Sequence, residues 1–311
     1  MSEAALVLAG PLPRDRRPAY IYLARLAPGS RRTMAQALHL VADLFGQTPE
    51  TMHWAALRYQ HTQAVRTKLA ETRAPGGVNR ILAAVRGVLK EAWRLGLMDA
   101  ESYHSATDLP GVRGERLPRG RALTRRELQK LFQTCANDES PASRRDAALI
   151  AVLYGAGLRR SEAVALDLSD YNPDTAELRV RHGKGQKARI GYATNGVKLA
   201  LDAWIAVRGS DAGPLFWPAG GRGRPLVNRR MTDQAVLLLL RRRAKQARVQ
   251  RFTPHDLRRS FISDLLDSGA DMVTVQKLAG HANVETMARY DRRGEEAKRR
   301  AAELLHVPFV R

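Results

Sequence analysis

Two reactive side chains stand close together near the end of the chain, in the stretch LAGHANVETMARYDR (residues 278–292). They are the imidazole of His281 and the phenol of Tyr290, nine residues later. Three guanidinium groups crowd the phenol in the sequence: Arg289, Arg292 and Arg293. A tyrosine has an ordinary pKa near ~10, so it needs cationic neighbours or a base before its oxygen becomes a nucleophile. A reactive phenol here would therefore need partners from elsewhere in the chain.

A histidine and an arginine share one face at the start of a predicted helix, TPHDLRRSF (253–261). Thr253 is a typical cap and Pro254 suits the first helical position. His255 and Arg258 lie three residues apart, so both project from the same side of that helix. The positive end of a helix favours acidic side chains. Two cationic types there favour a bound phosphate over a role in solubility alone.

Two further cationic residues lie close to glycines, and each gives only a weak signal when taken alone. Arg159, in YGAGLRRSEAVAL, lies between a glycine-rich turn and a helix that begins with Ser161 and Glu162. An arginine at such a helix start faces a place where anions bind well, although an exposed arginine near a turn is the commoner interpretation. Lys184, in GKGQKAR, lies at the tip of a predicted β-hairpin, where a solvated lysine is the ordinary interpretation.

Taken together and in this order, these motifs resemble the tyrosine recombinase family, the phage-type integrases. That family has an arginine in GLR.SE, a lysine in a GKG hairpin, a helical H..R, and GH followed nine residues later by tyrosine. The corresponding motifs here are GLRRSE, HGKGQ, HDLR and LAGHANVETMARY, across residues 155–292. The resemblance implies six catalytic residues: Arg159, Lys184, His255, Arg258, His281 and Tyr290. One departure is Arg160, where the family usually has an aliphatic residue; the preceding Gly-Leu selects Arg159 as the catalytic one.

The resemblance also implies an architecture and an activity. A helical core-binding domain and a catalytic domain, joined by a basic linker, would close around duplex DNA like a clamp. The enzyme would cleave and rejoin DNA through a 3′-phosphotyrosine and a Holliday junction, as in integration or excision of mobile DNA. Its partners would be double-stranded recombination sites and three further copies of the chain, assembled through the C-terminal tail. The covalent intermediate conserves bond energy, so we expect no cofactors, neither ATP nor a metal.

The chemistry of such a site accounts for the residue types. Attack of a phenol on a phosphodiester places extra negative charge on the non-bridging oxygens, which two arginines match bidentately. His255 is the candidate base for Tyr290, and Lys184 could protonate the leaving 5′-oxygen. His281 would hydrogen-bond the scissile phosphate. Glu162 would orient His255 without contacting the DNA itself.

Two other functions are compatible with parts of this pattern. A type IB topoisomerase uses the same nucleophile and clamp, but the GH motif, the compact first segment and the modest length favour a recombinase. A non-catalytic regulator is the other alternative, because MVTVQKLAGHANVETMARY (272–290) resembles a helix-turn-helix with Gly280 at its turn. A regulator would not need Arg159, Lys184 and the His255/Arg258 pair.

Composition is consistent with a DNA-binding protein. The 311 residues are 44% hydrophobic, enough for a folded chain, and carry 52 Lys+Arg against 31 Asp+Glu, a net charge of +21. Such a charge favours a polyanionic partner. The apolar runs are too short for a membrane span, the N-terminus lacks the charge order of a secretory signal, and the single Cys135 excludes an internal disulfide. We therefore expect a cytoplasmic, nucleoid-associated protein with no membrane partner.

The elements that must position these residues fall into two segments. A loose arm (1–18) precedes a helical core-binding domain (19–108). A basic linker (109–121) leads to a catalytic domain (122–294) and a helical tail (295–311). The linker LPGVRGERLPRGR cannot pack but can lie along phosphates. Its arginines are candidate DNA contacts: Arg113, Arg116, Arg119 and Arg121.

Periodicity indicates a mainly α fold with a small antiparallel β-sheet. In the first segment it predicts four helices, namely 30–46, one that begins at Thr48-Pro49 and continues through Trp54 and Leu57, 63–72, and 78–95. In the second it predicts helices at 124–135, 143–154, 196–207, 232–247, 254–267, 271–279, 284–290 and 295–305, and strands at 176–182 and 187–193. Thr124 and Glu127 form a predicted capping box.

Overall fold

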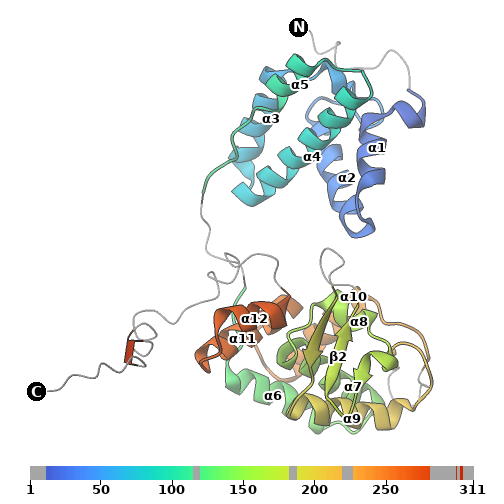
Figure 1. Cartoon of the computed structure of the whole chain (residues 1–311), viewed down its shortest axis with the longest axis vertical. Coiled ribbons are helices and arrows are strands. Elements are labelled where there is room, and N and C mark those ends of the chain that lie inside the picture. The colour runs from blue at the N-terminus through green and yellow to red at the C-terminus, as the bar shows by residue number, and fades with distance from the viewer. Residues whose placement is uncertain are drawn as a thin grey trace, which may run out of the picture. The chain divides into compact units, whose positions relative to one another are not determined.

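The computed structural model describes residues 12–114, 120–181, 188–218 and 227–280, together with residues 299, 302 and 303. The chain separates into two compact units, Met1–Pro118 (unit 1) and Arg119–Arg311 (unit 2). Figure 1 shows the helices and strands of each. Within the described residues the structure is mainly α-helical with one small antiparallel sheet, which confirms the predicted class. Among those residues, no helix is both long enough and apolar enough to cross a membrane.

The described part of unit 1 is helical. Its α-helices are α1 (Pro18–Arg25), α2 (Pro28–Asp43), α3 (Tyr59–Thr72), α4 (Pro75–Arg94) and α5 (Ala100–Thr107). Proline begins α1, α2 and α4, where its missing N–H is not needed because the first N–H groups of a helix have no helical partner. The helix α4 contacts the other four. Its apolar residues, spaced as the sequence predicts, form the centre of the core: Val78, Ile81, Leu82, Val85, Val88 and Leu89.

The helix predicted from Thr48-Pro49 through Trp54 and Leu57 is wrong. The chain instead makes a turn and then a single 3₁₀ turn, η3 (Trp54–Ala56). The hydroxyls of Thr48 and Thr51 accept from each other's backbone N–H at 3.3 and 3.0 Å, and such local bonds compete with a helix. The short helices α1 and α5 were not predicted, because eight residues give little more than two turns of periodic pattern.

The described part of unit 2 combines α-helices with one small sheet. Its described α-helices are α6 (Arg125–Ala136), α7 (Pro141–Gly155), α8 (Arg160–Ala165), α9 (Gly196–Arg208), α10 (Asp233–Gln246), α11 (Pro254–Asp267) and α12 (Met272–Ala279). The strands are β1 (Tyr171–Asn172), β2 (Glu177–Val180) and β3 (Arg189–Tyr192), paired antiparallel in the order β1-β2-β3. Leu178, opposite Gly191, and Val180, opposite Arg189, are buried in the domain core. The predicted strands are present in shorter form.

The helix α7 is the centre of unit 2. It contacts α6, α8, α9 and α11, and most of its residues are buried. A buried charge cluster ties it to α10. The carboxylate of Asp146 accepts hydrogen bonds from Arg145 on the same helix at 2.6 Å and from Arg243 of α10 at 2.7 Å. All three side chains are almost fully buried, so removing Asp146 would leave two buried guanidinium groups without this carboxylate. The cluster thereby fixes α10, whose first turn borders the site described below.

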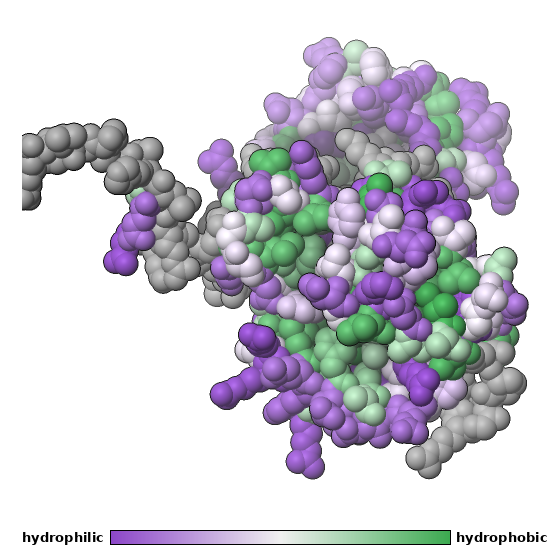
Figure 2. Space-filling view, turned by 60° about the horizontal axis from the view of Figure 1, so that its bottom comes forward, coloured by the Kyte–Doolittle hydropathy of each residue, from purple (hydrophilic) through white to green (hydrophobic). Residues whose placement is uncertain are grey.

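Figure 2 shows one surface of unit 2, on which hydrophilic side chains alternate with several hydrophobic patches. The exposed large apolar residues of the unit include Leu199 on α9 and Leu238 on α10.

Candidate active site

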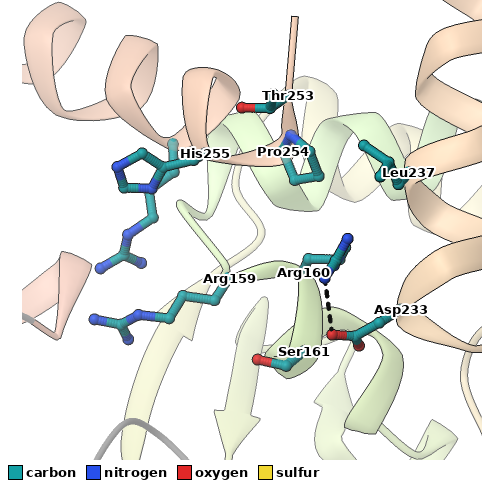
Figure 3. A pocket seen from close by; sticks show the side chains of 9 residues that line it. Arg159, Arg160, Ser161, Asp233, Leu237, Thr253, Pro254 and His255 are labelled. Atoms are coloured by element: carbon teal, nitrogen blue, oxygen red, sulfur yellow. Dashed lines mark ion pairs between the residues drawn. The ribbon is translucent and has the colours of Figure 1, made fainter. Parts of the chain in front are cut away.

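The first turns of α8, α10 and α11 border one cleft of about 440 Å³ in unit 2. Its lining residues are Arg159, Arg160, Ser161, Asp233, Leu237, Thr253, Pro254, His255 and Arg258. Figure 3 shows the side chains of Arg159 and His255 directed to the same side of the cleft. Three of the six predicted catalytic residues, Arg159, His255 and Arg258, thus lie together. The starts of α10 and α11 add the positive ends of two helix dipoles to these cationic groups.

Lys184, His281 and Tyr290 lie outside the described residues, and their roles stay predictions. Their places in the chain are nevertheless informative. Lys184 belongs to the segment between β2 and β3, and His281 directly follows Gly280, the last residue of α12's cap. The elements on either side of Lys184 and the helix that precedes His281 can therefore be described.

Arg159 is held in place at the start of α8. Its backbone N–H donates to Glu162 Oε2 at 2.8 Å and its Nη1 donates to Glu162 Oε1 at 2.6 Å. Its Nη2 donates to the carbonyl of Gly280 at 2.9 Å. The side chain keeps 24% of its surface exposed. The guanidinium is therefore oriented by the protein and still reachable from the cleft.

Arg160 has a different environment, although it lines the same cleft. Its Nη2 lies 3.3 Å from Asp233 Oδ2 of α10, and both side chains are partly exposed. Figure 3 shows the Arg160 side chain turned toward Asp233, away from Arg159 and His255. The geometry thus separates two neighbouring arginines that the sequence distinguished only through the preceding Gly-Leu.

Arg258 is buried on α11, one helical turn after His255. Its guanidinium donates to the carbonyl of Gly157, in the turn before Arg159, and to the carbonyl of Ala279, at the end of α12. The helix begins at Pro254, as predicted, and Asp256 Oδ2 accepts from the N–H of Thr253 at 2.8 Å. This cap explains why the first turn tolerates His255 and Arg258, since Asp256 supplies the acid that a helix start favours.

His255 is neutral over a wider range of pH than an ordinary histidine. His255 is an exposed residue, yet the protein packed on its other side lowers the pKa of its ring below the usual 6.5. Burial is the largest cause, followed by the positive charges of Arg259 and Arg258; Asp256 acts in the opposite direction. A neutral imidazole beside cationic groups is the form that accepts a proton.

Glu162 bridges two arginines. Its side chain is almost fully buried, and its Oε2 accepts from Arg189 Nη2 at 2.9 Å in addition to the bonds from Arg159. Burial alone would raise its pKa, but Arg189 and then Arg159 hold that pKa below its ordinary value. The family resemblance led us to expect that Glu162 orients His255. In the structure Glu162 accepts hydrogen bonds from Arg159 and Arg189, and its effect on His255 stays a prediction.

The end of α12 is bound by three arginines from three other elements. Arg189 Nε donates to the carbonyl of Leu278 at 3.1 Å, Arg258 to that of Ala279, and Arg159 to that of Gly280. Cationic groups are favourable at this negative end of a helix, where the last carbonyls have no helical partner. Arg189 was not predicted. The alternating residues around it indicated a strand, but not which partners its side chain would meet.

The linker arginines differ from one another. Arg113 is exposed at the end of the described part of unit 1, and Arg116 and Arg119 lie outside the described residues. Arg121, predicted to contact DNA, donates to both carboxylate oxygens of Glu127 at 2.6 and 2.7 Å and to the carbonyl of Gln250 at 2.9 Å. The guanidinium of Arg121 therefore links the start of unit 2 to α6, through Glu127, and to the segment before α11, through Gln250. Glu127 also completes the predicted capping box with Thr124.

Comparison with known proteins identifies the family. Residues 121–296 match the sequence model of the phage integrase family. The chain belongs to the phage integrase family. Tyrosine recombinase XerC of Azotobacter vinelandii is 36% identical to it over 242 residues, which cover 76% of this chain and 76% of the relative. Tyrosine recombinase XerA of Thermococcus kodakarensis is 30% identical over 274 residues, which cover 84% of this chain and 91% of the relative.

A solved structure shows the same fold. The Tn1549 transposon integrase, determined in complex with transposon right end DNA, aligns with a TM-score of 0.68 at 16% identity, over 93% of this chain and 99% of that one. Together with the family match and the relatives, this confirms the resemblance seen in the motifs: the chain is a tyrosine recombinase, a site-specific DNA recombinase. The family match contains every residue from Arg159 to Tyr290.

Proposed function

We propose that this tyrosine recombinase cleaves and rejoins duplex DNA at specific sites through a covalent 3′-phosphotyrosine on Tyr290. The convergence of Arg159, His255 and Arg258 on one cleft is the observation that carries the proposal. These residues come from the starts of α8 and α11, which are far apart in the sequence, and Tyr290 lies within the same family match.

The two arginines act on the phosphate. Guanidinium groups pair bidentately with phosphate oxygens and keep their charge at any working pH. In the structure, Arg159 and Arg258 donate to the carbonyls of Gly280 and Ala279. A guanidinium carries five N–H donors, so phosphate oxygens would bind beside these carbonyls. Stabilising the extra charge of the pentacoordinate transition state is then the main contribution of the pair.

Proton transfers complete the reaction. Neutral His255 accepts the phenol proton as the Tyr290 oxygen bonds to phosphorus, and the bond from phosphorus to the 5′-oxygen breaks. Lys184 donates the proton that this leaving oxygen requires, and His281 hydrogen-bonds a non-bridging oxygen. In the second half of the reaction a 5′-hydroxyl attacks the phosphotyrosine, and each proton returns along the same route.

A nicked suicide substrate tests the proposal. The wild-type chain should form a covalent protein–DNA adduct that accumulates, because the short strand released beyond the nick diffuses away and rejoining stops. Tyr290→Phe keeps the ring and should bind DNA with unchanged affinity while forming no adduct. A helix-turn-helix regulator would form no adduct with either chain. Absence of an adduct from the wild-type chain on its own site would refute the catalytic proposal.

DNA binding by the linker forms part of the proposal. Arg113, Arg116 and Arg119 would lie along phosphates, whereas the bonds of Arg121 to Glu127 favour a structural role for that residue. An arginine that neutralises one phosphate contributes about 0.9 to the slope of log affinity against log salt. Replacing Arg113 by alanine should therefore make that slope shallower, and replacing Arg121 should leave it unchanged.

We also propose that four copies assemble on two DNA sites through the tail, residues 295–311. The sequence EEAKRRAAELLHVPFVR is amphipathic, and Arg299 lies 3.1 Å from Glu303, one helical turn away. Deleting the tail should impair pairing of two sites and recombination much more than binding to one site. Normal recombination by the shortened chain would refute exchange of the tail between copies.

A further inference from the structure

Arg189 begins β3, directly after the segment that carries Lys184, and its side chain is 11% exposed. Its guanidinium reaches two partners at once, Glu162 Oε2 of α8 at 2.9 Å and the carbonyl of Leu278 in α12 at 3.1 Å. These three elements lie far apart in the sequence. Arg189 therefore joins β3 to two other parts of the site.

These bonds form a closed circuit with Arg159. Arg189 binds Glu162, Glu162 binds Arg159, and Arg159 binds the carbonyl of Gly280. Because Arg189 also binds Leu278, both arginines hold the same end of α12. If Arg189 shifted, the guanidinium of Arg159 and the residue that precedes His281 would shift with it.

The packing around Gly280 leaves little room for such a shift. Gly280 has a positive φ of 61°, and a Cβ atom added there would lie 2.9 Å from Cδ and 3.0 Å from Nε of Arg189. A side chain at that position would both strain the backbone and collide with Arg189. The turn that leads into His281 is thus packed directly against the Arg189 side chain.

Arginine is the residue type that this position requires. A guanidinium presents several N–H donors in one plane and so can serve a carboxylate and a carbonyl at the same time. A lysine has a single nitrogen on a flexible stem and would serve one partner well. Arg179 on β2, opposite Ile190, offers a comparison, because it is an exposed arginine of the same sheet.

We propose that Arg189 is a positioning residue of the recombination reaction, which acts through Glu162 on Arg159 and through α12 on the start of the His281 segment. The proposal rests on the function proposed above, because it assumes that Arg159 binds the scissile phosphate. Arg189 itself does not touch the DNA in this role. Its loss leaves DNA binding intact and disturbs the geometry of cleavage.

Arg189→Gln tests this role, with Arg179→Gln as the matched control on the neighbouring strand. Single-turnover adduct formation on the suicide substrate and DNA affinity are measured in parallel, with urea unfolding to show that each chain is folded. A displacement of about 1 Å at a reacting group costs on the order of 100-fold in rate. We expect a loss of about that size for Arg189→Gln, an affinity within about 3-fold of wild type, and a wild-type rate for Arg179→Gln.

A double-mutant cycle with Glu162→Gln separates positioning from general destabilisation. If Arg189 acts through Glu162, the double variant should cleave no more slowly than about the slower single variant. Losses that multiply would overturn the proposal. So would a wild-type cleavage rate for Arg189→Gln. If wild type itself forms no adduct, the proposed function fails first, so the two failures are distinct.

Arg189→Lys decides the matter if Arg189→Gln does not fold. The lysine keeps the positive charge beside Glu162, but its single nitrogen cannot occupy both points from which Arg189 Nε and Nη2 reach Leu278 and Glu162. We expect a folded chain that cleaves at least about 10-fold more slowly than wild type. A folded Arg189→Lys with the wild-type rate would overturn the proposal.

Discussion

Replacing Gly157 by alanine tests how tightly the turn before Arg159 is packed. Gly157 has a φ of 59°, in the left-handed region, and an added Cβ atom would lie 2.4 Å from the ring of Phe261. That ring is 7% exposed and packs in the small core between α11 and α12, so it has little freedom to move away. The carbonyl of Gly157 also accepts a hydrogen bond from Arg258. Alanine would therefore disturb the turn, the ring and both arginines.

The expected cost has two parts. A left-handed conformation costs a residue with a Cβ atom about 1–2 kcal/mol, and forcing an extra carbon into a packed site costs about 1–3 kcal/mol. Gly157→Ala should therefore lower the free energy of unfolding by about 2–5 kcal/mol. Gly269→Ala is the control, because Gly269 also has a positive φ, of 92°, but has open space where the Cβ atom would lie. It should show only the first part of the cost.

Urea unfolding followed by tryptophan fluorescence measures both variants, since Trp204 and Trp217 are buried in unit 2. Adduct formation by Gly157→Ala should also fall further than its stability explains, because the turn carries Arg159. Equal stability of the two variants would refute the packing that we describe at Gly157.

Three further predictions concern individual side chains of the site. Because the pKa of His255 is lowered, the neutral base persists below pH 6.5. The cleavage rate at subsaturating DNA should therefore fall only at more acid pH. A midpoint of this fall in rate above pH 6.5 would contradict the prediction. Lys184→Ala should slow cleavage of ordinary DNA by about 100- to 10,000-fold, and its cleavage rate should recover on DNA with sulfur at the 5′-bridging position. Arg159→Ala and Arg258→Ala should stay slow on both substrates. An equal Lys184→Ala defect on both substrates would exclude the acid role. Arg160→Ala removes only a partly exposed ion pair, so it should cost less than about 1 kcal/mol in stability and still form the adduct; loss of the adduct would place Arg160 in the reaction.

The parts of the site that depend on local pattern could be predicted from the sequence. The Thr253-Pro254 start of α11 and the spacing of His255 and Arg258 follow from cap preferences and helical periodicity, and the structure has both. The Thr124 capping box is likewise a local signal. The helix predicted after Pro49 rested on a local signal that was misinterpreted, because the hydroxyls of Thr48 and Thr51 form a turn there instead.

The parts that depend on tertiary contacts could not be predicted. Arg189 meets Glu162 and the end of α12 through tertiary structure, in which β3 pairs with β2 and α12 packs on α11. Nothing in the alternation around Arg189 specifies those partners. Arg258 is similar: its spacing from His255 was evident, but its burial between Gly157 and Ala279 depends on two distant segments.

The most direct test of the proposed mechanism is to map the covalent bond itself. The adduct from a suicide substrate is digested with protease and nuclease, and the peptide that retains a nucleotide is sequenced by mass spectrometry. The mechanism predicts one modified residue, Tyr290, joined to a 3′-phosphate. A nucleotide on any other residue, or a 5′-phosphate linkage to Tyr290, would contradict it.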